Sequence, residues 1–132
     1  MAAPLEAAKF RNSVSARRPS IFRDGLLDDR IALITGGSSG IGLGIARVYA
    51  ELGATVVIIG RREEKLATAI DQLSQDVSEA NFIAIAIDVR NHLAIRDSVN
   101  GIVERFGRLD ILINNAAGNF HCPTEALSEN AW

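Results

Sequence analysis

A glycine-rich segment is the part of this sequence whose residue types and spacing best suit ligand chemistry. It reads Thr35-Gly36-Gly37-Ser38-Ser39-Gly40-Ile41-Gly42 and lies between a short apolar run and the start of a helical pattern. Glycines there let the backbone turn tightly and approach a pyrophosphate without obstruction from Cβ atoms. The helix that follows presents free N–H groups and the positive end of its dipole to an anion. We therefore expect residues 36–42 to bind phosphate, with a ligand-free turn as the alternative.

The spacing of these glycines narrows the kind of phosphate loop. Glycines at positions 36, 40 and 42 give the pattern G-x-x-x-G-x-G, which differs from the G-x-G-x-x-G of the common dinucleotide fingerprint. No Gly-Lys-Ser/Thr follows, so the loop of nucleoside triphosphatases is excluded.

Two adjacent arginines follow the second apolar run, at the place where dinucleotide-binding proteins distinguish NAD from NADP. A β-branched run ends at Gly60, and Arg61 and Arg62 follow, roughly 20 residues past the glycines. A carboxylate at this place binds the ribose 2′-hydroxyl of NAD, whereas arginine forms charge-assisted hydrogen bonds to a 2′-phosphate. We therefore expect NADPH rather than NADH. The alternative is that both arginines simply lie on the first turn of an exposed helix.

Nucleophilic and metal chemistry find little support in the sequence. Cys122 is the only cysteine, and His92 and His121 are the only histidines. Adjacent side chains of an extended segment point to opposite faces, so His121 and Cys122 make a poor catalytic dyad. Suitably spaced metal ligands are too few, so no metal site is expected.

Strands alternating with helices are expected to position these residues. Apolar runs at 31–34, 55–59, 82–87 and 111–113 predict four strands. Apolar residues at helical spacing predict three helices between them, with faces made of Ile41, Ile45, Val48 and Leu52, then Leu66, Ala69, Ile70 and Leu73, then Ile95, Val99, Ile102, Val103 and Phe106. The alternation predicts an α/β fold with a Rossmann-type doubly wound parallel sheet, of which the N-terminal half is present.

Three segments in order resemble the short-chain dehydrogenase/reductase family. They are the glycine-rich segment with Thr35 in front, Asp88-Val89 after the third strand, and Asn114-Asn115-Ala116-Ala117-Gly118 after the fourth. The last is close to the family's Asn-Asn-Ala-Gly motif, with one alanine inserted. Its continuation through Asn119-Phe120, with Cys-Pro and Leu-Ser beyond, looks like the 2,4-dienoyl-CoA reductases. The resemblance covers residues 30 to 132.

The resemblance implies roles for residues outside the glycine loop. Asp88, with Val89 beside it, would meet the adenine ring, although Asp88 could instead cap or precede the next helix. Asn114 would tie down the strand end and contact the coenzyme. Arg61, Arg90 and Phe120 would help to hold an acyl-CoA substrate, whose phosphates need positive partners. The alternatives are a solvated loop charge for Arg90 and a core aromatic for Phe120.

The resemblance also implies an activity, the NADPH-dependent reduction of 2,4-dienoyl-CoA esters to enoyl-CoA in unsaturated fatty-acid breakdown. Family members use a Tyr-x-x-x-Lys pair, but the only tyrosine here is Tyr49 and the only lysines are Lys9 and Lys65. We therefore expect a fragment that lacks catalytic residues and is inactive alone, from a parent enzyme that is homo-oligomeric at full length. A general ketone or alcohol oxidoreductase and a non-catalytic nucleotide-binding protein are the alternatives.

Composition bounds the remaining possibilities. A net charge of −2 and a pI of about 5.6 give no basic field for nucleic acid or an anionic membrane. No apolar run approaches the roughly 20 residues that a membrane span needs. We expect a soluble protein, cytoplasmic in preference to peroxisomal or mitochondrial. Residues 1–25 are basic and are expected to be a disordered or targeting extension, and residues 26–132 belong to the NADP-binding domain.

Overall fold

Strands and helices alternate strictly through residues 21–117, the part of the chain that the computed structural model describes. The elements in order are β1 (Ile31–Thr35), α1 (Gly40–Glu51), β2 (Thr55–Gly60), α2 (Glu63–Asp76), β3 (Phe82–Ala86), α3 (His92–Phe106) and β4 (Ile111–Ile113). The expected α/β fold is confirmed, as are the four strands and three helices. Glycines end two of the helices in the left-handed region, with Gly53 following α1 at φ 101° and Gly107 following α3 at φ 74°.

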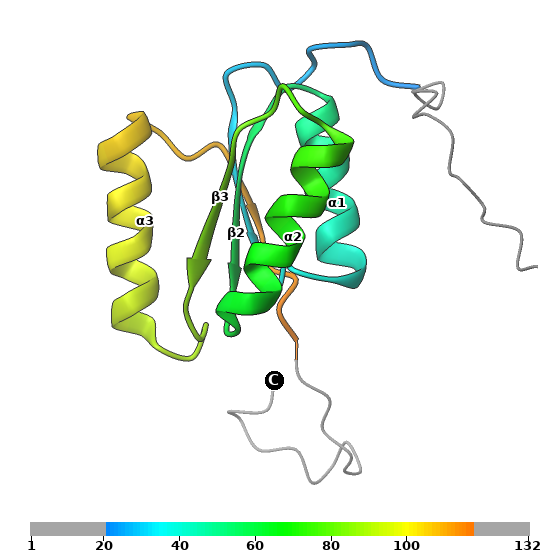
Figure 1. Cartoon of the computed structure of the whole chain (residues 1–132). Coiled ribbons are helices and arrows are strands. Elements are labelled where there is room, and N and C mark those ends of the chain that lie inside the picture. The colour runs from blue at the N-terminus through cyan, green and yellow to red at the C-terminus, as the bar shows by residue number, and fades with distance from the viewer. Residues whose placement is uncertain (1–20, 118–132) are drawn as a thin grey trace, which may run out of the picture.

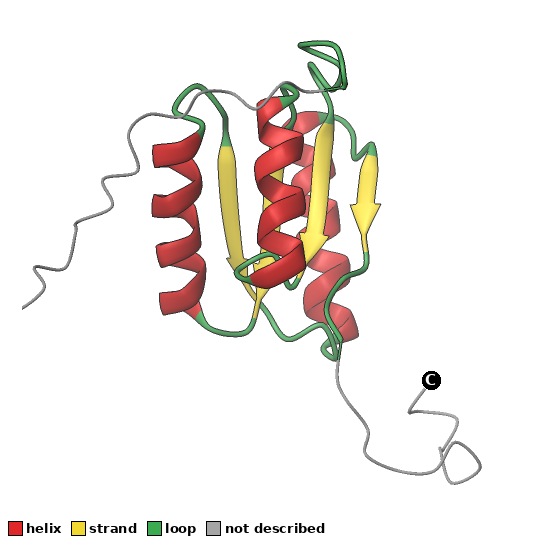
Figure 2. Ribbon diagram, turned by 90° about the vertical axis from the view of Figure 1, so that its right-hand side faces the viewer, coloured by secondary structure: helices red, strands yellow, loops and turns green. Residues whose placement is uncertain are grey.

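The four strands form one parallel sheet in the order β3-β2-β1-β4. All four arrows point the same way in Figure 2. The chain passes outward from β1 through β2 to β3, then returns to place β4 on the opposite side of β1. The strand order therefore reverses at β1, and a doubly wound sheet binds its ligand at the carboxyl ends of the strands beside such a reversal.

Helices cover both faces of the sheet (Figure 1). On one face α1 and α2 pack over a cluster that includes Ile34, Val56 and Ile58. On the other, α3 packs over a cluster that includes Leu33 and Val57. Successive residues of β1 and β2 therefore pack against helices on opposite faces of the sheet. This explains why both strands are apolar at successive positions and buried through their interior.

The buried face of α1 differs from the predicted one. Its buried residues are Gly42, Ala46 and Ala50, whereas Ile41 is 77% exposed and Val48 is 41% exposed. Large residues already fill the sheet surface beneath the helix, so only small side chains let α1 come close. The prediction that Ile41 and Val48 face the core is therefore wrong. Val103 of α3, 42% exposed, is also wrongly placed, whereas the predicted core residues Leu66, Ala69 and Leu73 of α2 are confirmed as buried.

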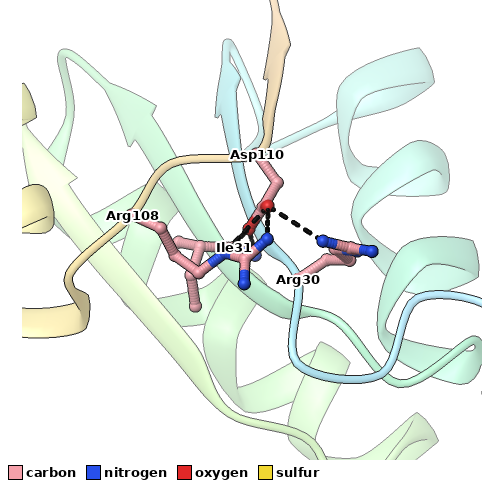
Figure 3. A network of polar contacts seen from close by, with 4 residues as sticks. All are labelled: Arg30, Ile31, Arg108 and Asp110. Atoms are coloured by element: carbon pink, nitrogen blue, oxygen red, sulfur yellow. Dashed lines mark hydrogen bonds and ion pairs between the residues drawn. The ribbon is translucent and has the colours of Figure 1, made fainter.

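An aspartate joins the starts of β1 and β4 (Figure 3). The Asp110 carboxylate accepts a hydrogen bond from the Ile31 backbone N–H at 2.9 Å, and the Asp110 backbone N–H donates to the Ile31 carbonyl at 3.0 Å. Arg108 and Arg30 form ion pairs with the same carboxylate. The Asp110 side chain is 13% exposed. These donors lower the pKa of Asp110 to about 2, with the Arg108 hydrogen bond as the largest cause.

Candidate functional site

The predicted binding residues come together at the carboxyl edge of the sheet. In the parallel register Thr35 of β1 lies beside Ile59 of β2, and Gly60 lies beside Ala86 of β3. The glycine loop after β1, the arginines after β2 and Asp88 after β3 therefore emerge at one edge. Asn114 follows β4 at this edge too, next to the loop on the other side of β1.

The glycines of the loop are required by close backbone approaches. Gly36 has φ 66°, and its N–H donates to the Ile59 carbonyl at 2.8 Å. A Cβ atom on Gly42 would lie 2.4 Å from the Gly36 carbonyl oxygen, and one on Gly37 would lie 2.6 Å from a methyl carbon of Ile58. At Gly40 the φ is 56°, and a Cβ would meet nothing within 4 Å. Gly36, Gly37 and Gly42 thus hold the turn against the sheet, while Gly40 leaves open space at its outer side.

The N-terminus of α1 keeps its backbone donors available. Ser39 is the N-cap residue in an extended conformation, and its side chain makes no capping hydrogen bond. The first turn of α1 holds no acidic residue, in contrast to Glu63 and Glu64 in the first turn of α2. The helix dipole and the free N–H groups therefore face the loop without a competing side chain, which suits an anionic ligand.

An asparagine that the sequence analysis gave no separate role braces this loop from β4. The Asn115 side-chain amide donates to the carbonyls of Thr35 and Gly36 at 3.1 Å and 3.2 Å. In return the Thr35 hydroxyl oxygen accepts from the backbone N–H groups of Asn115 and Ala116, each at 3.0 Å. The preceding residue Asn114, predicted to contact the coenzyme, is exposed. Asn114 is therefore exposed at the carboxyl ends of the strands, whereas Asn115 supports the glycine loop through hydrogen bonds.

Two arginine side chains at the end of β2 are exposed. Arg61 and Arg62 are exposed, and neither has an ion-pair partner among residues 21–117. A Cβ on Gly60 would lie 3.6 Å from the Ser38 hydroxyl, so the end of β2 directly adjoins the glycine loop. Arg62 is the N-cap residue of α2 and Arg61 precedes it, so neither arginine lies in the first turn of the helix, where the alternative placed both.

Asp88 precedes α3 rather than capping it. The N-cap residue is Asn91, whose side chain accepts from the Ala94 N–H at 3.1 Å. Asp88 forms an ion pair with Arg90, whose guanidinium lies 2.6 Å from one carboxylate oxygen. Arg90 lowers the pKa of Asp88 to about 2, chiefly through the side-chain hydrogen bond, and Arg61 adds a smaller electrostatic effect. The predicted coenzyme residue and the predicted substrate residue are thus in direct contact.

Other parts of the described chain are less suited to a dinucleotide. A cavity of about 300 Å³ at the opposite edge of the sheet is lined by the acidic residues Asp24, Asp28, Glu51 and Glu79, whose charge repels phosphate. Within residues 21–117 no three residues of the metal-ligating types are grouped as a metal site. No described helix is both long and apolar enough to cross a bilayer. Phe120, His121 and Cys122 lie outside the described residues.

Comparisons with known proteins agree with the fold. A family model described as short chain dehydrogenase matches residues 30–132. The peroxisomal 2,4-dienoyl-CoA reductase [(3E)-enoyl-CoA-producing] of Danio rerio is 46% identical over 112 residues, which are 85% of this chain and 37% of that protein. The chain therefore spans well under half the length of this curated relative.

Solved structures of whole enzymes contain the same arrangement. A citronellol catabolism dehydrogenase of Pseudomonas aeruginosa PAO1 matches with a TM-score of 0.72 and 36% identity, covering 85% of this chain and 45% of that one. A metagenomic short-chain oxidoreductase in complex with NADP matches with a TM-score of 0.69 and 33% identity, covering 80% of this chain and 48% of that one. These likenesses support the Rossmann-type sheet and a nicotinamide coenzyme site.

Proposed function

Because the chain belongs to the short chain dehydrogenase family, we propose that residues 26–132 form the N-terminal part of one NADP-binding domain. The protein that contains them would reduce 2,4-dienoyl-CoA esters to enoyl-CoA with NADPH. The observation that carries the choice of coenzyme is the end of β2, where Arg61 and Arg62 follow the strand directly and are exposed and unpaired among the described residues. The first carboxylates come after them, with Glu63 and Glu64 in the first turn of α2. A carboxylate there would repel the 2′-phosphate, whereas guanidinium groups bind it.

The described residues fit a dinucleotide at this edge. The loop from Gly36 to Gly42, with the uncapped start of α1, would hold the pyrophosphate. Asp88, Val89 and Asn114 would line the coenzyme along the ends of β3 and β4. Bound there, the coenzyme supplies the hydride for the reduction. The chain's own residues bind and orient it, and the open space at Gly40 leaves room for that approach.

The substrate assignment rests on the name of the Danio rerio relative and on the positive charge at this edge. Arg61 and Arg90 follow adjacent strands, and both would attract the phosphates of coenzyme A. Phe120 would add an apolar contact. Binding energy from this remote part of the substrate can orient the reacting diene, because it restricts the motion of the whole molecule.

Calorimetric titration of the full-length protein with NADP⁺ and with NAD⁺ tests the coenzyme assignment. Replacing Arg61 or Arg62 by Ala removes charge-assisted hydrogen bonds, so NADP⁺ should bind about tenfold to a hundredfold more weakly while NAD⁺ binding changes little. Arg96→Ala is the matched control, because Arg96 is an exposed arginine of α3 that takes no part in the proposed coenzyme contacts. Tighter binding of NAD⁺ by the unaltered protein, or binding of neither coenzyme, would refute the assignment.

A broader oxidoreductase activity is the second candidate, favoured by the likeness to the citronellol catabolism dehydrogenase. Loss of the conjugated diene absorbance of a 2,4-dienoyl-CoA, followed with NADPH, distinguishes the two. For a dienoyl-CoA reductase, Arg90→Ala should raise KM for the acyl-CoA with little change in turnover of a small alcohol or ketone. Turnover of alcohols alone, with no consumption of the dienoyl-CoA, would instead support the second candidate.

A further inference from the structure

The ion pair between Asp88 and Arg90 engages both oxygens of the carboxylate. One oxygen of Asp88 accepts from the Arg90 backbone N–H and from Nε, both at 3.0 Å. The other oxygen accepts from Nε at 3.1 Å and from Nη2 at 2.6 Å. These four contacts come from three N–H groups, because the single Nε hydrogen is shared between the two oxygens. Arg90 therefore occupies most of the roughly four lone-pair positions of the carboxylate.

Each ligand of the proposed function needs one member of this pair. On that proposal, which this inference depends on, the adenine amino group donates to Asp88 and a phosphate of the acyl-CoA binds Arg90. A donor reaching Asp88 competes with the N–H groups of Arg90 for the same two oxygens. A phosphate that takes the guanidinium group of Arg90 likewise draws it away from Asp88. Both ligands therefore disrupt the same internal contact.

We propose that the Asp88–Arg90 ion pair couples the coenzyme site to the acyl-CoA site. The ligand that binds first separates the pair, and the second ligand then meets an Asp88 or an Arg90 that is already released. Each ligand therefore binds more tightly in the presence of the other. The effect must be the same in both directions, because coupling between binding free energies is reciprocal.

The exposure of the pair limits the size of the coupling. The Arg90 side chain is 80% exposed and the Asp88 side chain is 31% exposed, so water screens their attraction. Ion pairs of this kind contribute little, which corresponds to a coupling of about two- to fivefold in affinity. Arg61 stays near Asp88 when Arg90 leaves, so the carboxylate keeps one positive neighbour. The carboxylate is ionised at neutral pH, since its pKa is about 2.

The test measures NADP⁺ affinity of the full-length protein by calorimetry, without and with saturating free coenzyme A. We expect the dissociation constant of NADP⁺ to fall about two- to fivefold when coenzyme A is present. Asp88→Asn keeps a side-chain oxygen that can accept from adenine but ends the ion pair. In that variant the two NADP⁺ constants should agree, and coenzyme A alone should bind more tightly than to the unaltered protein.

Asp97→Asn is the matched control, because it removes the same charge from an exposed aspartate that pairs with Arg96 at 3.6 Å on α3. Its coupling should equal that of the unaltered protein. If both ligands bind the unaltered protein and the ratio is one, or if Asp88→Asn keeps the ratio, the coupling is refuted and the proposed function stands. If NADP⁺ or coenzyme A fails to bind at all, both proposals are refuted.

Discussion

Substituting alanine for glycine at two positions of α1 should change stability in opposite directions. A methyl group at Gly42 would lie 2.4 Å from the Gly36 carbonyl oxygen and 2.6 Å from the Asn115 amide nitrogen. Ordinary contact begins near 3.4 Å, so the backbone of the loop must move by about 1 Å. At Gly44, one half-turn further along the same helix, a methyl group meets nothing within 4 Å.

The two effects can be estimated from these contacts. Overpacking costs about 1–3 kcal/mol, while replacing a helical glycine by alanine stabilises by about 0.5–1 kcal/mol. Gly42→Ala should therefore lower the free energy of unfolding by about 1–2 kcal/mol, and Gly44→Ala should raise it by about 0.5–1 kcal/mol. Because Gly36 belongs to the phosphate loop, Gly42→Ala should also weaken NADP⁺ binding by about tenfold, since catalytic and binding geometry tolerate little displacement.

Urea unfolding of the full-length protein, followed by circular dichroism, measures the two stabilities, and calorimetry measures NADP⁺ binding. Gly101→Ala in α3 is a second control, because a methyl group there also meets open space. Equal stabilisation by all three substitutions would refute the argument from close approach. So would normal NADP⁺ binding by Gly42→Ala.

Three further predictions concern the contacts between the β1 and β4 ends of the chain and the exposed face of the edge strand β4. Asn115→Asp would turn a carboxylate toward the carbonyls of Thr35 and Gly36, so urea unfolding should show a loss of about 1–3 kcal/mol, whereas Asn100→Asp on the exposed side of α3 should change little. The pKa of Asp110 in the folded protein is about 2, below its ordinary 3.8, so its stabilising effect is complete above pH 4 and is lost as the pH falls toward 2. Asp110→Asn should therefore flatten the dependence of the free energy of unfolding on pH between about pH 4 and pH 2. An unchanged dependence would contradict the lowered pKa. Leu112 is 53% exposed on the edge strand β4, so Leu112→Lys should reduce self-association of the 132-residue chain in sedimentation velocity, and equal association of both chains would exclude this edge as the cause.

The sequence predicted the elements well because each depends on its own residues. The apolar run of β2 and the helical spacing of Leu66, Ala69 and Leu73 in α2 appear in the structure as expected. The glycine loop was also predictable, since its position between a strand and a helix follows from the local pattern. The placement of Arg61 and Asp88 at one edge then followed from the parallel sheet.

Contacts between distant segments could not be predicted in the same way. Apolar spacing suggested that Ile41 and Val48 face the core, but the fully buried positions of α1 are Gly42, Ala46 and Ala50. That arrangement depends on the Gly36 carbonyl and on residues of β2. Asp110 gave only a weak signal, as a carboxylate near Arg108 before a strand, because its backbone partner Ile31 lies 79 positions earlier.

The ion pair of Asp88 with Arg90, unlike these contacts, joins residues that are close in the sequence. The two residues are only two positions apart, and opposite charges at that spacing are visible in the sequence. What the sequence could not show is that the backbone after β3 turns so that Arg90 contacts both carboxylate oxygens. A local charge pattern therefore predicts an ion pair, but it does not predict which carboxylate oxygens the guanidinium group contacts.

The position of β4 has a consequence for the order in which the molecule folds. The pairs β1–β2 and β2–β3 are each closed by a single helix, whereas β4 pairs with β1 across three helices and two strands. Longer loops cost more entropy to close, so we expect the β1–β2–β3 unit to form first and β4 to join late. The hydrogen bonds of Asn115 with the glycine loop therefore form only at that late step. On the proposed function, a nascent chain acquires its affinity for the dinucleotide only after β1, β2 and β3 have paired.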